Sequence, residues 1–472
     1  MQSEKKICNF LPYSLSVDCV LNYVDKFHSH FIAHHYDNSG TAKNYVLGLL
    51  KCSKGEANME RMEEEIEKSE YRAYQQFISN SNWDSPGLQK SVAQEASALL
   101  SSQKEKRGLD TGYIIDESGH MKKGKMSVGV SRQYAGVSGK VDNCQVGVYS
   151  SLVNEKYATI INERIFLPKT WTEDEGRCEK AGIPTDERIY KTKPELAFDM
   201  IEEDIERGVK FDWIGGDGLY GHNTELCRKL ESISQFYVLD VHKDECVYLE
   251  EPTILITEKT TKKGKVILSK KANKVPVRLD ELFKTINPKA WKTEVIRDTT
   301  KGKLKLKVYK LSVWYWNKKD DKAIKRTIII TKTLDKKPKI KFSVSNGDVD
   351  EYSCKQYAYF VSQRYWVERT FDNAKNELGM SDYQIRKWKS WHNHHSLLFL
   401  TSLLIMKQQI DNVNVPLLSF RDARILIILQ VFGSKKEIEI RLKQMDKRHK
   451  KRQKDIDYNY RIRKESPKIL TS

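Results

Sequence analysis

Three acidic residues stand in settings that suit phosphoryl transfer. Asp116 follows the apolar run at residues 113–115, which predicts a strand that ends at this carboxylate. Asp217 follows a second apolar run and lies between two glycines, and such small neighbours let a bulky, charged ligand approach the backbone. Glu368 lies in a helix-forming segment. If both strands and the helix reach one edge of a sheet, the three carboxylates converge there.

Three converging carboxylates could hold two Mg²⁺ ions. Phosphoryl transfer needs an activated hydroxyl and a stabilised leaving oxygen, and two metal ions roughly 3.5–4 Å apart can serve both. Mg²⁺ prefers hard oxygen ligands, and Mn²⁺ is expected to substitute for it. Each aspartate also has an ordinary interpretation, since Asp116 could cap a turn and Asp217 could form an Asp-Gly turn. The expected metal site therefore rests on Asp116, Asp217 and Glu368 together.

The segment around Glu368 has two faces at helical spacing. Arg364, Glu368 and Lys375 share one face, so an acid flanked by two bases would line the border between the helix and a sheet. The two bases could then hold the DNA backbone beside the metal ions. The ordinary interpretation is a surface pair of Arg364 with Glu368, worth about 0.2–0.5 kcal/mol. The neighbouring face is apolar and predicts packing on the sheet; it carries Phe360, Val367, Phe371, Ala374 and Leu378.

Hydrophobic patterning predicts the elements that position these residues. Three β-rich runs come first, at residues 112–118, 144–152 and 156–167. A helix at 193–208, a strand at 211–218, a helix at 222–232 and a strand at 235–241 follow. The first of these helices would bury Leu196, Met200, Ile201 and Ile205. Three antiparallel strands followed by alternating helices and strands are compatible with an α/β fold that contains a ribonuclease-H-like mixed sheet with flanking helices.

Changes in composition divide the chain into five expected regions. Residues 1–105 form a helical N-terminal DNA-binding domain, and a Ser-rich, charged linker begins at Ser101. Residues 106–249 form the first part of the catalytic core, and residues 250–350 form a lysine-rich, β-rich insertion. Residues 351–410 complete the core with the Glu368 helix, and residues 411–472 form a helical, basic C-terminal region.

The composition favours a polyanionic partner. Lys and Arg number 82 and Asp and Glu 64 in 472 residues, which gives a net charge of +18, and Lys and Arg on phosphates release condensed counterions. A protein that is merely lysine-rich is the plain alternative. The eight cysteines are scattered and predict reduced, buried thiols. The charged start MQSEKKICNF does not resemble a signal peptide, and the apolar run at residues 397–406 is too short to span a bilayer, so we expect a cytoplasmic protein with no membrane partner.

Three stretches together resemble a known family. They are IIDESGHMKKGKMSVGVSRQYAGVSGKVDNCQVGVYSSL, DWIGGDGLYG and RYWVERTFDNAKNELGMSDYQIRKWKSWHNHHSLLFL, of which the last is the most specific. In this order they are similar to bacterial insertion-sequence transposases of the Asp-Asp-Glu type, in the branch marked by a Tyr-Arg-Glu-Lys signature. The resemblance covers most of the chain.

The resemblance implies roles for individual residues. It makes Asp116, Asp217 and Glu368 the catalytic and metal-binding acids. The Arg of the signature falls on Arg364 and its Lys on Lys375. Its Tyr position is occupied by Val361, a departure that concerns a phosphate contact and not the metal site.

The resemblance also implies an activity. The chain would bind terminal inverted repeats, nick double-stranded DNA by Mg²⁺-dependent hydrolysis and join the 3′ ends to target DNA, as a homodimer in a synaptic complex. A domesticated DNA-binding protein and a nuclease that cuts without joining are the two alternatives.

A basic segment after the Glu368 helix is a further candidate for DNA contact. Arg386, Lys387, Trp388 and Lys389 interleave cations with an aromatic ring, which suits a DNA groove. The ordinary interpretation is the solvated start of a helix. The nearby histidines lack cysteine or histidine partners at ligand spacing, so no zinc site is expected.

Overall fold

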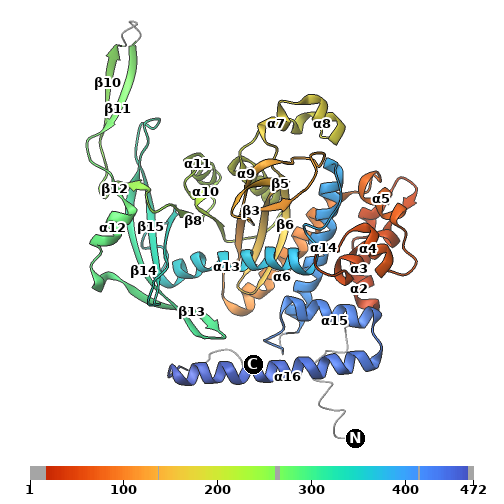
Figure 1. The fold of residues 1–472 in the computed structure, drawn as a ribbon. Helices are drawn as coiled ribbons and strands as arrows, with labels where there is room; N and C mark the ends of the chain where they lie inside the picture. Colours follow the sequence, from red (N-terminus) through yellow and green to blue (C-terminus); the bar gives the residue numbers. More distant parts are fainter. Residues whose placement is uncertain (1–16, 137, 261–265, 413–414, 466–472) are drawn as a thin grey trace. The chain divides into compact units, whose positions relative to one another are not determined.

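The computed structural model describes residues 17–136, 138–260, 266–412 and 415–465 (Figure 1). The chain divides into two compact units. The first unit comprises residues 1–211, 365–458 and 469–472, and the second comprises residues 212–364 and 459–468. Residues 1–16 and 466–472, which open the predicted N-terminal domain and close the predicted C-terminal region, lie outside the described residues. The five predicted regions are finer than these two units and stay a prediction.

The first unit contains an antiparallel sheet. Its strands are β3 (Gly112–Met121), β4 (Ser131–Ala135), β5 (Lys140–Asn154) and β6 (Tyr157–Ile165), and the long β5 pairs with each of the other three. The pairing places Asp116 opposite Tyr149 and Tyr149 opposite Glu163. Because directly opposite residues of antiparallel strands share a face, these three side chains form one transverse row.

Helices cover both faces of this sheet. Helix α9 (Lys193–Glu206) packs on one face, where the buried Asp204 accepts a hydrogen bond of 2.7 Å from Tyr113 Oη. Helix α14 (Trp388–Asp411) packs on the opposite face, which carries the row of Asp116. The predicted apolar face of α9 is confirmed for Leu196, Met200 and Ile201 but wrong for Ile205, which is exposed because Asp204 takes the buried position.

Helices form most of the N-terminal part of the first unit, as predicted. They are α2 (Val17–Asp25), α3 (Ser39–Lys51), α4 (Met59–Glu65), α5 (Tyr71–Ser79) and α6 (Ser85–Arg107), with the short η1 (His28–Phe31) and the β1–β2 hairpin (Ile32–Ala33, Tyr36–Asp37) between α2 and α3. They are bonded to α14: Tyr45 Oη lies 2.9 Å from His394 Nδ1, and Asn393 donates to the carbonyl of Ile78 at 3.0 Å. The N-terminal helices and the antiparallel sheet thus belong to one unit.

The predicted linker at Ser101 is wrong. Helix α6 continues to Arg107 and ends at Gly108, whose φ of 65° is the left-handed conformation that glycine adopts without strain. Lys104, Lys106 and Arg107 stand in its last turn, where cations interact favourably with the helix dipole. The charged composition reflects a helix end and not an extended connection.

The second unit is built around parallel strands β7 (Trp213–Gly216) and β8 (Tyr237–Val241). Helices α10 (Gly218–Gly221) and α11 (Thr224–Ser232) connect them. Strand β16 (Ile340–Ser345) pairs antiparallel with β8, and β15 (Ile324–Thr333), β14 (Gly302–Tyr315) and β13 (Lys292–Thr299) continue that sheet. The predicted β-rich insertion is confirmed, and its strands extend the sheet of β8. The smaller elements are β9 (Cys246–Val247), β10 (Ile254–Thr260), β11 (Val266–Ala272), β12 (Val277–Arg278), α12 (Leu279–Thr285) and η3 (Pro288–Ala290).

The predicted fold class is confirmed. Three antiparallel strands (β3, β5, β6) and the parallel pair β7–β8, with flanking helices and a β-rich insertion, are the elements of a ribonuclease-H-like mixed α/β fold. The remaining helices are α7 (Lys169–Thr172), α8 (Glu175–Ala181), η2 (Thr185–Glu187), α13 (Cys354–Glu377), α15 (Phe420–Phe432) and α16 (Lys435–Ile462).

The structure describes most of the cysteines and the helices that were considered as membrane-spanning segments. The described free cysteines are Cys52, Cys144, Cys178, Cys227, Cys246 and Cys354, and all of these but Cys246 are buried. Among the described helices, none combines the length and the apolar character needed to cross a membrane. The start MQSEKKICNF lies outside the described residues.

Candidate active site

Asp116 lies inside a strand, not at its end as predicted. Strand β3 continues for five residues beyond Asp116 because Glu117 to Met121 go on pairing with β5. Asp116 is half-buried, and its Oδ1 accepts a hydrogen bond of 2.9 Å from the backbone N–H of Glu117. Because the residues before and after Asp116 are both paired with β5, the backbone fixes the direction of this carboxylate.

The helix that carries Glu368 packs on the face of the sheet to which Asp116 points. Phe371 of α13 contacts the ring of Tyr149, with ring centroids 5.5 Å apart, and Tyr149 is the cross-strand neighbour of Asp116. The predicted apolar stripe is confirmed, because Phe360, Val367, Phe371, Ala374 and Leu378 are all buried. Glu368 is exposed, one turn before Phe371. Asp116 therefore points to the side of the sheet on which the helix of Glu368 packs.

Lys375 links this helix to the strand of Asp116. Its Nζ donates a hydrogen bond of 3.2 Å to the carbonyl oxygen of Gly119 on β3. Burial lowers the pKa of Lys375, while the nearby carboxylates of Asp372 and Asp116 act in the opposite direction. The ammonium of Lys375 therefore lies in the electrostatic field of Asp116 and ties α13 to β3.

A buried chain of hydrogen bonds runs beneath the row of Asp116, and no sequence pattern indicated it. Ser381 Oγ lies 2.9 Å from His120 Nδ1, His120 Nε2 lies 2.7 Å from Tyr149 Oη, and Tyr149 Oη lies 3.0 Å from His395 Nε2. Burial lowers the pKa of both histidines, that of His395 to about 4. Both rings are therefore neutral at pH 7.

The direction of every proton in this chain follows from its last member. His395 Nδ1 lies 2.9 Å from the carbonyl oxygen of Trp391, which can only accept, so Nδ1 carries the proton and Nε2 accepts from Tyr149. The Tyr149 oxygen then accepts from His120 Nε2–H, and Ser381 donates to His120 Nδ1. The chain holds β3, β5 and α14 together directly beside Asp116.

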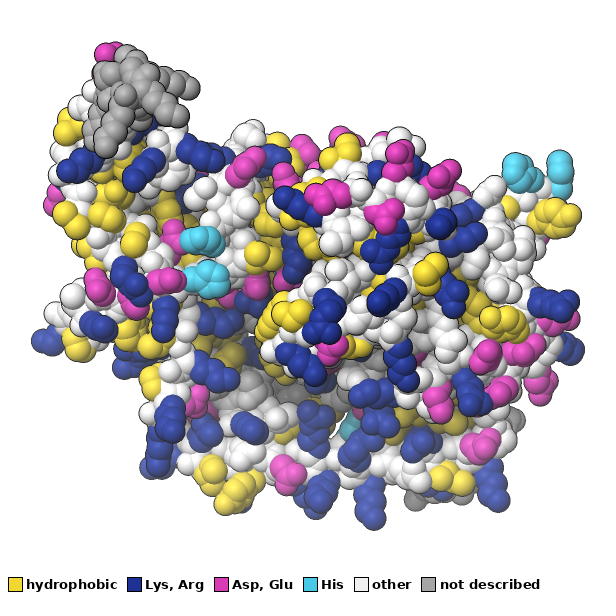
Figure 2. Space-filling model, turned by 45° about the horizontal axis from the view of Figure 1, so that its top comes forward, with side chains coloured by type: hydrophobic (Ala, Val, Ile, Leu, Met, Phe, Trp, Pro, Cys, Tyr) yellow, Lys and Arg dark blue, Asp and Glu magenta, His cyan; other side chains and the backbone are white. Residues whose placement is uncertain are grey.

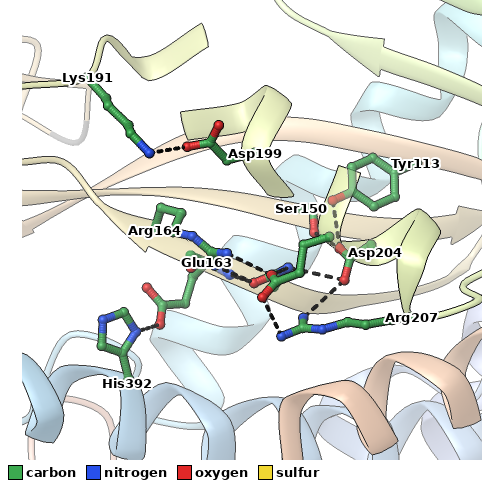
Figure 3. A network of polar contacts seen from close by, with 11 residues as sticks. Tyr113, Ser150, Glu163, Arg164, Lys191, Asp199, Asp204, Arg207 and His392 are labelled. Atoms are coloured by element: carbon green, nitrogen blue, oxygen red, sulfur yellow. Dashed lines mark hydrogen bonds and ion pairs between the residues drawn. The ribbon is translucent and has the colours of Figure 1, made fainter. Parts of the chain in front are cut away.

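The third member of the row, Glu163, links the sheet to α14 through contacts of its carboxylate. Its carboxylate lies 2.5 Å from Trp391 Nε1 and 2.6 Å from His392 Nδ1 (Figure 3 shows the contact with His392). Burial alone would raise the pKa of Glu163, but His392 and these hydrogen bonds lower it to about 2. Glu163 is completely buried and ionised, so it is a structural acid and not a metal ligand.

A second polar network, also shown in Figure 3, lies on the α9 face. Asp204 meets Tyr113 at 2.7 Å and Arg207 at 3.2 Å, while Arg164 Nη2 donates to Glu203 at 2.7 Å. Burial raises the pKa of Asp204 despite the opposing effect of Arg207. The sheet of the first unit is therefore fixed by polar contacts to a helix on each face.

Asp217 stands at the end of β7, in the second unit, as predicted. Its side chain caps the short helix α10 and accepts a hydrogen bond of 2.9 Å from the backbone N–H of Leu219. Two nearby glycines also meet a requirement of packing. A Cβ at Gly221 would lie 2.0 Å from the carbonyl oxygen of Asp240, and one at Gly216 would lie 3.1 Å from Tyr220. These glycines allow α10 to pack closely on β8.

The other predicted DNA-contacting residues divide into two groups. Arg364 Nη1 lies 2.8 Å from Asp240 Oδ2 in the second unit. Lys389, in the first unit, donates to the carbonyl of Asn80 at 3.4 Å and to Asn82, and the Trp388 ring packs against His392. Arg386 and Lys387 are exposed and line a groove of the first unit. Roles for these residues in DNA binding stay a prediction.

The three acids supply the right donors for a divalent metal ion, since all are carboxylates and none is fully buried. Asp116 and Glu368 come from the first unit and Asp217 from the second. Across the described residues, no three His, Cys, Asp or Glu side chains are gathered closely enough to hold a metal ion.

Comparison with known proteins defines the class. The chain belongs to the DDE superfamily of endonucleases, whose family model matches residues 26–303. The matched range contains Asp116 and Asp217, and Glu368 follows it. Members of this superfamily depend on divalent metal ions.

Individual relatives agree with this class. The chain is 23% identical, over 312 residues, to the probable transposase for insertion sequence element IS701 of Microchaete diplosiphon; these residues are 66% of this chain and 67% of that protein. The expected resemblance to insertion-sequence transposases is thereby confirmed, and the enzyme is a DNA-cleaving transposase of the DDE type. A cryo-EM structure of the piggyBac transposase synaptic complex with hairpin DNA aligns with 93% of this chain and 84% of that one, at 10% identity and a TM-score of 0.38.

Proposed function

We propose that this transposase moves an insertion sequence by cutting DNA at terminal inverted repeats and joining the 3′ ends to target DNA. Asp116, Asp217 and Glu368 are the catalytic acids of the proposal. The single observation that carries it is the packing of Phe371, one turn after Glu368, on Tyr149, the cross-strand neighbour of Asp116. That packing brings a strand carboxylate and a helix carboxylate of the first unit to one side of the sheet.

The proposed cofactor is Mg²⁺, two ions per site, with Mn²⁺ as a substitute. When bound, the ions would activate the attacking hydroxyl and stabilise the leaving oxygen. The part of the protein is to present oxygen ligands without rearrangement. Asp116 is held because the residues before and after it pair with β5. Asp217 is oriented by its hydrogen bond as the N-terminal cap of α10, and Glu368 by the buried apolar stripe of α13.

Double-stranded DNA is the proposed partner, both as transposon end and as target. The net charge of +18 favours a polyanion. Figure 2 shows Lys and Arg side chains spread over the face drawn, with acidic side chains among them. Charge dispersed in this way supports binding to the DNA backbone at many points, and the bacterial cytosol is the proposed location.

Joining to target DNA is the step that separates this proposal from its alternatives. The experiment combines a labelled duplex that bears the terminal repeat with a target plasmid, with Mg²⁺ or with EDTA. We expect cuts at the repeat boundary and labelled plasmid, both only with Mg²⁺. Cuts without labelled plasmid would instead identify a nuclease that does not join, and repeat binding without cuts would identify a DNA-binding protein that has lost the reaction.

A further inference from the structure

A groove of about 700 Å³ lies in the first unit, and none of the three candidate acids is among its lining residues. Three segments line it: residues 58–80, which include helices α4 and α5, the connection between β3 and β4 (residues 122–127), and residues 383–390, which end in the first turn of α14. Sequence analysis singled out the last of these segments, but not the other two. All three belong to the same compact unit, so the groove does not depend on the arrangement of the two units.

Hydrogen bonds fix the three segments to one another. Lys122 Nζ donates to the carbonyl of Tyr383 at 3.0 Å, and the backbone N–H of Val128 donates to the carbonyl of Arg386 at 2.9 Å. On the opposite side, Asn393 donates to the carbonyl of Ile78 at 3.0 Å and Lys389 donates to that of Asn80 at 3.4 Å. Lys122 and Lys389 thus brace the groove, which is formed before any partner binds.

The charge in the groove is mostly positive and not neutralised within the protein. Lys123, Arg386 and Lys387 are exposed and line the groove, and none of their side chains has a hydrogen bond or ion pair with the described residues. Glu60 is the acid that lines it. The bonds that hold residues 383–386 use backbone carbonyls, so the side chains of Arg386 and Lys387 are left to bind a partner.

The other lining groups are mainly hydrogen-bonding side chains. They include the amides of Asn58, Gln75, Asn80 and Gln384 and the hydroxyls of Ser79 and Ser127. Apolar and aromatic side chains also line the groove, namely Met59, Tyr71, Met126, Tyr383 and Ile385. Sites for small organic ligands are predominantly apolar and aromatic, whereas cations, amides and hydroxyls outnumber such side chains in this lining. Cations, amides and hydroxyls are the groups that contact phosphate oxygens and sugars along a nucleic-acid backbone.

We propose that this groove binds the phosphodiester backbone of duplex DNA, with Lys123, Arg386 and Lys387 as phosphate contacts and Lys122 and Lys389 as braces. The inference rests on the proposed function, which supplies the DNA. It adds a binding surface that the N-terminal helices share with the catalytic sheet. It also assigns different roles to neighbouring cations of the basic segment. Arg386 and Lys387 contact DNA, whereas Lys389 holds α14 to the end of α5 through its hydrogen bond to the carbonyl of Asn80.

The test is the salt dependence of duplex binding by the full chain, measured in EDTA so that nothing is cut. The binding constant falls as salt rises, and each lost phosphate contact should make the slope of log K against log salt shallower by about 0.9. The triple variant Lys123→Gln/Arg386→Gln/Lys387→Gln should therefore reduce the magnitude of the slope by about 2.7. The matched control is Lys90→Gln/Lys106→Gln/Lys180→Gln, which removes three exposed cations of the same unit that do not line the groove. Its slope should remain close to that of the wild type.

Two further variants make the result decisive. The double variant Arg386→Gln/Lys387→Gln should reduce the magnitude of the slope by about 1.8. It replaces the triple variant if thermal unfolding shows that the triple variant is misfolded. Glu368→Gln should abolish cleavage with the slope unchanged, which separates the groove from the reaction. An unchanged slope in the groove variants, an equal loss in the control variant, or a wild type that does not bind duplex DNA would each overturn the inference.

Discussion

At Asp116, backbone pairing decides where a carboxylate points. The residue is held between Ile115 and Glu117 in a strand paired with β5, and its cross-strand neighbour Tyr149 belongs to a fully bonded chain. An aspartate at the end of a strand would move with the loop that follows it. The position inside the strand therefore suits a metal ligand, because its geometry is set before metal ions bind.

Lys375 provides a prediction at the residue scale. Its hydrogen bond to Gly119 predicts that Lys375→Gln lowers the free energy of unfolding by about 1.5–3 kcal/mol, the range of a bond made by a charged group. Cleavage should fall along with stability, because α13 loses its tie to β3. Urea unfolding and repeat-duplex binding measure the two effects. Weaker DNA binding with unchanged stability would instead place Lys375 on the DNA, as the helix face that it shares with Glu368 predicts.

At the scale of elements, Glu163 determines how firmly α14 is docked on β6. A buried carboxylate with two short hydrogen bonds is costly to neutralise or remove, because its partners Trp391 and His392 would lose their acceptor. The same helix carries His394 and His395, which bind Tyr45 and Tyr149. Helix α14 therefore connects the N-terminal helices to the sheet that carries Asp116.

The pKa of Glu163 predicts a dependence of stability on pH. Its folded pKa is about 2 against an ordinary value of 4.5, so its charge stabilises the fold fully above pH 4.5, and the contribution is lost as pH falls towards 2. Glu163→Gln should cost about 3 kcal/mol at pH 7, and the difference from wild type should shrink below pH 4.5. Urea unfolding at several pH values measures this, with the exposed Glu202→Gln as control. A difference that does not vary with pH would contradict an ionised Glu163 in the folded protein.

Elements with strong periodicity were predictable and contacts between elements were not. The apolar stripe of α13 and the β-rich runs of β5 and β6 are visible in the sequence because period alone defines them. Strand β4 was missed because its residues SRQYA are mostly polar. The end of α6 was mistaken for a linker because charged residues suit both.

The candidate acids could be identified, but their setting could not. Asp116 and Asp217 follow apolar runs, which the sequence shows directly. The chain from His120 through Tyr149 to His395 depends on strand register and on the packing of a helix that is distant in sequence. The close approach of Gly221 to Asp240 also comes from tertiary packing, which the glycine pattern alone does not reveal.

For the whole molecule, the proposed synaptic complex predicts a change of mass. Two DNA ends must be processed together, so the 55.0 kDa chain should form a complex of two chains with two repeat duplexes. Light scattering coupled to size-exclusion chromatography measures this, with a duplex of unrelated sequence as control. One chain per repeat duplex at saturating concentrations would contradict the proposed homodimer.

The central claim is that Asp116, Asp217 and Glu368 form one metal-dependent nuclease site. Its most direct test measures cleavage of the labelled repeat duplex with Mg²⁺, with Mn²⁺ and with EDTA. The proteins compared are the wild type, Asp116→Asn, Asp217→Asn, Glu368→Gln and the control Glu202→Gln. We predict that each of the three site variants loses cleavage with both metals while repeat binding persists, and that the control cleaves like the wild type. Normal cleavage by any one of the three variants would remove that acid from the site and contradict the account.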